Sequence, residues 1–169
     1  LINLSPGKKR KILPITDILY AAARVKEAGY NIIVDDDQFR DSIDYISYKN
    51  ALEQRCTSAP DFVFVRTSLP SFFSDQKVAQ KLKSLWPDSL FFLFGPIFSA
   101  EEIVKMALEQ IIFDGIITNE VEDIILDIIE EKPYESIPGL YFLGNRSYLC
   151  ANKNLHFTDM NKLPFPAYE

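Results

Sequence analysis

The sequence predicts an α/β fold in which a parallel β-sheet is covered by helices on both faces. Two short and almost wholly apolar runs, residues 90–94 and 111–117, alternate with two amphipathic segments. Strands that are buried on both faces read as continuous apolar runs. Their alternation with helices is typical of a sheet between two helical layers. These observations organise the interpretation of the whole chain.

The first half of the chain repeats the alternation of strand and helix. Residues 1–4, 30–34 and 62–65 are the expected strands. Residues 15–28, 41–55 and 74–85 are the expected helices. Thr16 or Asp17 can cap the first helix, and Gly29 can close it in the left-handed conformation. With the strands at 90–94 and 111–118, this order predicts a three-layer α/β/α Rossmann-like (flavodoxin-like) parallel sheet of about five strands.

The second half adds two more helices and then changes character. Ser99 with Glu102 forms a capping box for a fourth helix, and Asn119 is placed to cap a fifth. Beyond Pro133, residues 137–142 and 148–151 predict a β-hairpin. The tail is rich in proline and is expected to be extended. We therefore expect a Rossmann-like domain at 1–133, a hairpin extension at 134–156 and a linker at 157–169.

Composition excludes several classes of function. The 169 residues suit one domain with a substantial core, and the net charge of −6 gives no support for a nucleic-acid partner. No apolar run reaches the length of a membrane span and no signal peptide is evident, so we expect a cytoplasmic location and no membrane partner. Cys56 and Cys150 fit no metal-binding spacing, so no metal site is expected.

A ligand of such a sheet binds outside the carboxyl ends of the strands. Thr67, Ser68, Gly95 and Thr118 follow strand ends, where small or hydroxyl residues let a bulky ligand approach the backbone. Helix capping and tight turning are the competing explanations for these residues. Asp35 could hydrogen-bond a ligand at the end of its strand.

Several well-known sites are missing from the sequence. Neither a G-x-G-x-x-G fingerprint nor a P-loop is present, which excludes an ordinary NAD enzyme or a nucleotide triphosphatase. The acids at 35–37 follow the second strand, where a receiver domain would not place them. His156 has no partner in sequence, and no Ser-His-Asp or Cys-His set supports a hydrolase. We therefore predict no catalytic residue in this chain.

The order of short motifs resembles the N-terminal cobalamin-binding domain of cobalamin-dependent radical S-adenosylmethionine (SAM) proteins. The motifs, each weak alone, are Leu1-Ile2-Asn3-Leu4-Ser5-Pro6, Ile18-Leu19-Tyr20-Ala21-Ala22 with Gly29-Tyr30-Asn31 and Asp35, Pro60-Asp61-Phe62-Val63, Gly95-Pro96 with Ser99-Ala100, Asn119-Glu120-Val121-Glu122, Ile137-Pro138-Gly139-Leu140-Tyr141, and Asp159 through Leu163-Pro164-Phe165-Pro166-Ala167-Tyr168. The relatives include enzymes like the magnesium-protoporphyrin IX monomethyl ester cyclase.

This resemblance implies a division of labour between two domains. The present chain would hold a cobalamin (B12) at the carboxyl edge of its sheet, with Ser5, Leu69, Pro96, Asn119 and Glu120 joining the candidates above. A downstream radical SAM domain of the same polypeptide would hold a 4Fe-4S cluster and S-adenosylmethionine. The parent would then be a methyltransferase or a cyclase, and this chain alone is not expected to be catalytic.

The sequence also departs from the family's pattern. Pro96 replaces the second glycine of the family's loop, Asn119 replaces a glycine, and the D-x-H-x-x-G motif is absent. The resemblance therefore implies that no protein imidazole would coordinate the cobalt. These departures keep open an alternative: a degenerate Rossmann-like domain that no longer binds cobalamin and serves substrate gating or protein interaction.

Overall fold

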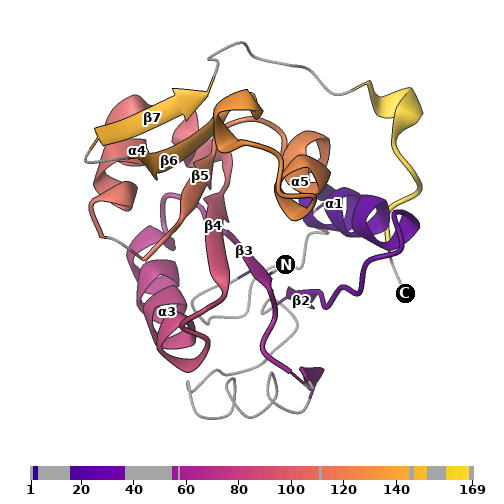
Figure 1. The fold of residues 1–169 in the computed structure, drawn as a ribbon, viewed down its shortest axis with the longest axis horizontal. Helices are drawn as coiled ribbons and strands as arrows, with labels where there is room; N and C mark the ends of the chain where they lie inside the picture. The colour runs from indigo at the N-terminus through magenta and orange to yellow at the C-terminus, as the bar shows by residue number, and fades with distance from the viewer. Residues whose placement is uncertain are drawn as a thin grey trace.

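A computed structural model describes residues 2–3, 16–36, 55–56, 58–110, 112–144, 147–151 and 159–167. The described elements alternate as the sequence predicts, and Figure 1 shows their arrangement. In chain order they are β1 (Ile2–Asn3), α1 (Thr16–Glu27), β2 (Asp35–Asp36), β3 (Phe62–Arg66), α3 (Phe72–Leu85), β4 (Leu90–Phe94), η2 (Pro96–Ser99), α4 (Glu101–Leu108), β5 (Gly115–Ile117), α5 (Val121–Ile129), η3 (Tyr134–Ser136), β6 (Leu140–Gly144), β7 (Ser147–Ala151) and η4 (Met160–Lys162).

The strands form one mostly parallel sheet in the order β2-β1-β3-β4-β5-β6-β7. The first five strands in this order are parallel to one another. In contrast, β6 pairs antiparallel with both β5 and β7. The sheet thus differs from the predicted one of about five strands. The described part contains seven strands, and two of the parallel ones, β1 and β2, are only two residues long.

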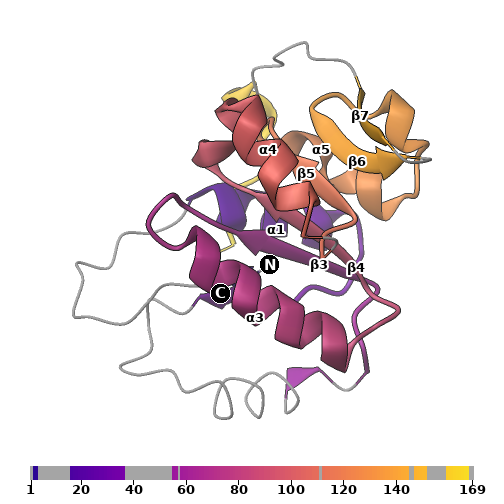
Figure 2. The same ribbon diagram turned by 90° about the vertical axis from the view of Figure 1, so that its left-hand side faces the viewer.

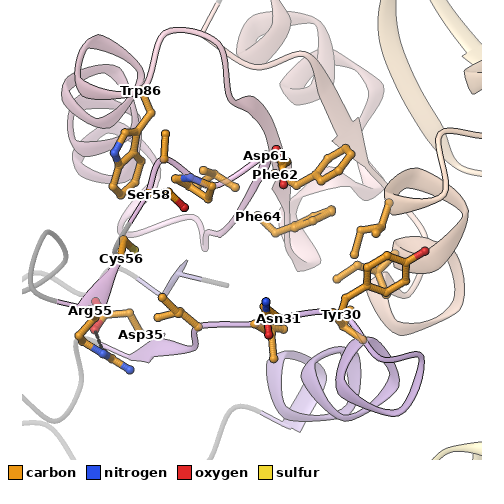
Figure 3. Close-up of a pocket in the computed structure, with 18 of the residues that line it drawn as sticks. Tyr30, Asn31, Asp35, Arg55, Cys56, Ser58, Asp61, Phe62, Phe64 and Trp86 are labelled. Atoms are coloured by element: carbon orange, nitrogen blue, oxygen red, sulfur yellow. Dashed lines mark hydrogen bonds and ion pairs between the residues drawn. The ribbon is translucent and has the colours of Figure 1, made fainter.

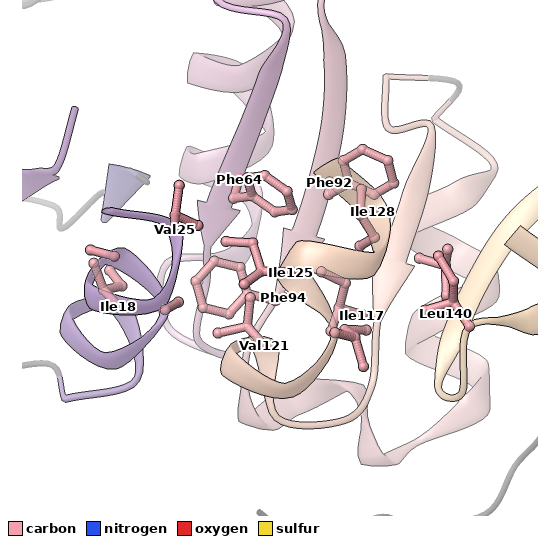
Figure 4. Packing of buried hydrophobic residues seen from close by; sticks show 14 of the residues in the cluster. Ile18, Val25, Phe64, Phe92, Phe94, Ile117, Val121, Ile125, Ile128 and Leu140 are labelled. Carbon is pink, nitrogen blue, oxygen red and sulfur yellow. The ribbon is translucent and has the colours of Figure 1, made fainter. Parts of the chain in front are cut away.

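Helices cover both faces of the sheet, as an α/β Rossmann-like domain requires. Phe64, Phe92 and Ile117 point toward α1 and α5, and the apolar faces of those helices cover them (Figure 4). Val63, Val65, Phe91, Leu93 and Ile116 point the other way and pack under α3 and α4. Figures 1 and 2 show these two helical layers on opposite sides of the strands.

The central strands have the sequence that this double burial demands. Phe91, Phe92 and Leu93 of β4 are fully buried, since alternate residues of one strand enter opposite cores. The predicted helix and strand boundaries are confirmed here: β4 occupies 90–94 as expected, and α1 lies within the expected 15–28. Gly29 ends α1 at φ +88°, the left-handed conformation that glycine adopts without steric cost.

Three local predictions were wrong. Residues 30–34 were expected to form a strand, but the strand begins only at Asp35. Ser99 lies inside the 3₁₀ turn η2, and the residue that caps α4 is Ala100. Asn119 does not cap α5, which begins after Glu120, because the Asn119 amide donates instead to the carbonyl of Pro138 at 3.4 Å.

Other predictions fall outside the described residues and stay predictions. They concern Ser5, the second helix apart from Arg55, and His156. The tail, where it is described, is extended at residues 163–167 and returns to α1, because the Ala167 amide donates to the Leu19 carbonyl at 3.2 Å. No helix in the described part of the chain is long and apolar enough to cross a membrane.

Candidate functional site

The carboxyl ends of β3, β4 and β5 carry most of the residues predicted to bind a ligand. Because these strands are parallel, the loops that follow them share one edge of the sheet. The structure brings two of the predicted residues, Thr67 and Gly95, into direct contact. Thr118 and Asn119 form a separate group with the turn before β6, and Asp35 pairs with Arg55 at 2.8 Å.

Gly95 is required by the backbone of Thr67. Its φ is +146°, and a Cβ at this position would lie 2.1 Å from the Thr67 carbonyl oxygen. The Thr67 amide in turn donates to the Phe94 carbonyl at 2.9 Å, so the loop after β4 rests on the loop after β3. The glycine at this point therefore has a packing explanation that does not need a ligand.

Asp75 is a buried acid beneath the same loops. Only 1% of it is exposed, and the Thr67 hydroxyl donates to its Oδ2 at 2.6 Å. Its other oxygen, Oδ1, has no hydrogen-bond partner among the described residues. Burial raises the pKa of Asp75 to about 7, although the Thr67 hydrogen bond and nearby Arg66 act in the opposite direction.

A second buried acid, Glu122, lies at the start of α5. It is 5% exposed, and its Oε2 has no hydrogen-bond partner in the described part of the structure. Its pKa is raised to about 7, chiefly by burial and in smaller part by the carboxylates of Glu120 and Asp17. Arg24 of α1 lies beside this turn, donates to the Glu122 backbone carbonyl, and lies 3.7 Å from the Asp123 carboxylate.

Arg66 joins the end of β3 to the first turn of α1. Its Nε donates to the Asp17 carboxylate at 2.7 Å. Its charge also lowers the pKa of Asp75, while the charge of Asp17 raises the pKa of Glu122. The carboxyl edge thus combines Arg66 with acids from the first turns of α1, α3 and α5, and Arg24 lies beside the α5 turn.

Thr118 and Asn119 serve the turn that leads to β6. The Thr118 hydroxyl and amide both donate to the Gly139 carbonyl, at 2.9 and 2.8 Å. Gly139 has φ +74°, and a Cβ there would lie 2.4 Å from the Asn119 side chain. Two of the predicted ligand-binding side chains are therefore already engaged within the protein.

Apolar side chains are exposed at the same edge. Leu69, which was predicted to bind a ligand, is 69% exposed, and Phe73 on the first turn of α3 is 68% exposed. Pro96 is exposed as well, and Ser68 is partly buried against Ser71, whose hydroxyl lies 2.9 Å from that of Ser68. We call Leu69 and Phe73 the apolar rim.

Sequence reasoning missed the buried acids. An acid in the first turn of a helix is explained by the helix dipole, so neither Asp75 nor the helix-five acids signalled burial. Only the surrounding apolar run at 121–129 hinted that Glu122 lies on a crowded face. The described residues contain no group of three or more His, Cys, Asp and Glu that could hold a metal ion.

Comparison with solved structures identifies a similar fold. One is a radical S-adenosylmethionine methyltransferase, TsrM, from Kitasatospora setae, with cobalamin and a [4Fe-4S] cluster bound; its TM-score is 0.70 at 16% identity, over 98% of this chain and 30% of that one. TsrM with tryptophan substrate and a SAM analogue gives 0.68 at 17% identity, over 89% and 29%.

The other comparisons set the limit of this likeness. No family model matches the chain, and no curated protein matches it. The chain spans less than a third of the TsrM chains that it resembles. At this level of identity the likeness shows that this chain shares its fold with part of an enzyme whose structure holds cobalamin.

Proposed function

We propose that this chain is the cobalamin-binding domain of a radical SAM enzyme and that it orients a corrinoid at the carboxyl edge of its sheet. The observation that carries the proposal is the fold similarity over 98% of the chain to a structure with cobalamin bound. The motif order in the sequence supports the same function independently of that comparison.

The residues at this edge fit a corrinoid in one respect. The apolar rim, Leu69 and Phe73, offers exposed hydrocarbon against which a large flat ring can pack. Asp75 Oδ1 and Glu122 Oε2 are buried beneath the surface, so a ligand at this edge does not reach them. The bound group would supply methyl-transfer or redox chemistry at cobalt, while the protein would position it and exclude water.

The remaining chemistry belongs, in this proposal, to a downstream domain of the same polypeptide. That domain would hold the 4Fe-4S cluster and S-adenosylmethionine, and the parent enzyme would be a methyltransferase or a cyclase. The coding sequence beyond Glu169 tests this part. A CxxxCxxC motif there supports the proposal, and a continuation without a cluster motif contradicts it.

Retention of hydroxocobalamin tests the binding itself. The purified chain is mixed with hydroxocobalamin and desalted, and the visible absorbance of the protein fraction is measured. We expect one equivalent to stay with the chain and Leu69→Asp with Phe73→Asp to abolish retention. Met106→Asp is the matched control, since Met106 is an exposed apolar residue of α4, and it should retain the corrinoid. A colourless wild-type fraction would reject the proposal.

The alternative is a Rossmann-like domain without cobalamin that gates substrate or binds another protein. The observation that favours it is the internal engagement of polar groups at the edge. The side chains of Thr67, Thr118 and Asn119 all donate hydrogen bonds to other groups of the protein: the Asp75 carboxylate, the Gly139 carbonyl and the Pro138 carbonyl. If the desalted chain is colourless but the apolar rim variants lose binding to the downstream domain, this alternative is supported instead.

A further inference from the structure

A cavity of about 890 Å³ lies inside the sheet, away from the proposed corrinoid edge. One wall is formed by residues 30–33 with Asp35, and the opposite wall by Phe62, Val63 and Phe64 of β3 (Figure 3). Ile125 and Ile129 of α5 line it on one face of the sheet, and Trp86, at the end of α3, lines it toward the other. The cavity is therefore a slot between two lines of chain and between the two helical layers.

The register of β1 explains the shape of this slot. Ile2 pairs with both Asp35 and Val65, and Asn3 pairs with Asp36 and Arg66, so β1 separates β2 from β3 at that level. On the amino-terminal side of this pairing, residues 30–33 and residues 62–64 continue along opposite sides of the cavity. Two strands that flank one missing strand lie roughly 10 Å apart, because neighbouring strands are separated by about 4.8 Å. The slot thus has the width of one strand.

The backbone of β3 presents a hydrogen-bonding edge to the slot. The Asp61 carbonyl accepts from Leu90 at 2.9 Å and the Thr67 amide donates to Phe94 at 2.9 Å, so the odd-numbered residues of β3 direct their backbone groups toward β4. Backbone direction alternates along a strand, so the backbone groups of Phe62 and Phe64 point away from β4. The pairing of Ile2 with Val65 uses the Phe64 carbonyl, which leaves the Phe62 amide and carbonyl and the Phe64 amide facing the slot. An extended chain is the occupant whose own backbone can pair with that edge.

The faces of the slot define the side chains of the occupant. In-register neighbours in a parallel sheet point to the same face. A residue opposite Val63 would enter the core under α3 beside Trp86, and a residue opposite Phe62 would enter the core under α5. Trp86 on one face and Ile125 and Ile129 on the other are apolar, so the occupant is apolar at these two positions, as central parallel strands are. Polar residues also line the cavity, among them Asn31, Arg55 and Asp61.

We propose that this cavity is an insertion slot for an extended apolar segment that runs parallel to β3. In the register of β1, the partners of Val63 and Phe62 are the two positions that directly precede Leu1, so the occupant is an upstream continuation of β1. Its insertion would join residues 30–34 to the sheet as a true strand and fix Asp35 at the carboxyl edge. This proposal does not depend on cobalamin binding.

N-terminal extension of the chain tests the slot. Three versions carry the added residues Val-Ile-Val-Ile, Val-Ile-Val-Pro or Gly-Ser-Gly-Ser before Leu1. We expect the first to slow hydrogen exchange of the Phe62 and Phe64 amides by roughly tenfold or more, to raise the Tm, and to shift the emission of Trp86, the single tryptophan. The proline version has similar hydrophobicity, but its last added residue lacks the amide that would donate to the Phe62 carbonyl, so it should protect much less.

Each outcome of this comparison is decisive. Protection by the first extension alone supports strand insertion. Equal protection by all three versions, or unchanged exchange at Phe62 and Phe64 in the first, contradicts it. An apolar dye that binds the unextended chain and the chain with the Val-Ile-Val-Ile extension equally well would also contradict the proposal, because the extension would then leave the dye site open.

Discussion

At the scale of single residues, the carboxyl edge combines close backbone packing with buried acids. Gly95 and Gly139 let neighbouring loops approach to distances that a side chain would forbid. Asp75 and Glu122 lie in the first turns of α3 and α5, where burial makes the charged form costly. Both features can be tested without knowledge of the ligand.

Gly95→Ala should destabilise the fold by about 3 kcal/mol or more, because the new Cβ meets the Thr67 carbonyl oxygen in a positive-φ conformation. Gly29→Ala is the matched control: its φ is +88°, but nothing lies within 4 Å of the new Cβ, so only about 1 kcal/mol of backbone strain is expected. Denaturant unfolding measures both. Equal losses for the two variants would refute the packing explanation of Gly95.

Asp75 should make the fold less stable as pH rises. Its pKa is about 7 in the folded chain, whereas the ordinary pKa of an aspartate is 3.8. The folded state therefore binds one proton more than the unfolded chain between about pH 4 and pH 7. Stability therefore falls with rising pH across that window and its loss is complete above it. The shift corresponds to an upper bound of about 4 kcal/mol.

Asp75→Asn should reduce this pH dependence, leaving the part due to Glu122, and make the chain more stable than wild type at pH 8, as measured by urea unfolding at several pH values. Asp88→Asn is the control, since Asp88 is exposed and should change neither slope nor midpoint appreciably. A variant with the wild-type pH profile would show that Asp75 does not carry the effect.

At the scale of elements, one aromatic residue adds side-chain contacts between the parallel sheet and β6, which already pairs with β5 through its backbone. The ring of Tyr134, in η3, lies 6.0 Å from that of Phe92 in β4 and 5.5 Å from that of Phe142 in β6, both at edge-to-face angles. Such pairs contribute beyond their buried area. The ring therefore ties the antiparallel strands to the central strand that organises the core.

Tyr134→Ala should lower the free energy of unfolding by about 2–4 kcal/mol through loss of these contacts. Tyr134→Phe keeps the ring and should cost less than about 1 kcal/mol. Chemical denaturation of both variants measures the difference. A loss in the phenylalanine variant as large as that in the alanine variant would assign the effect to the hydroxyl rather than to the ring.

The elements also show how far sequence reasoning reached. The apolar run at 90–94 and the 3.6-residue pattern of α1 and α5 depend on burial alone, and burial follows from pattern, so these elements were predicted well. Strand 30–34 failed because a strand needs a paired neighbour, which local sequence cannot supply. Ser99 and Asn119 failed as caps because a neighbouring turn or 3₁₀ helix competed for the same residue.

The sequence predicted where the candidate residues lie in the fold, but not which contacts they make. Topology alone puts Thr67, Gly95 and Thr118 at one edge, since parallel strands share their direction. Which side chains remain available depends on tertiary contacts: the Thr67 hydroxyl is taken by Asp75 and that of Thr118 by Gly139. The buried acids arise from the tertiary packing of the first turns of α3 and α5, and no local pattern encodes that packing.

At the scale of the whole molecule, the two edges of the sheet carry different features. The carboxyl edge has the apolar rim, Arg66 and the buried acids, whereas the cavity lies inside the sheet, between residues 30–35 and β3. We assign the corrinoid to the carboxyl edge and an added strand to the cavity. A ligand that bound in the cavity would reverse this assignment.

Hydrogen exchange in the presence and absence of hydroxocobalamin tests that assignment most directly. We predict that the corrinoid slows amide exchange in the loops at 67–69, 95–98 and 118–120, where parallel strands end, and leaves residues 30–33 unchanged. Protection confined to residues 30–33 and 62–64, or no protection anywhere, would contradict the central claim.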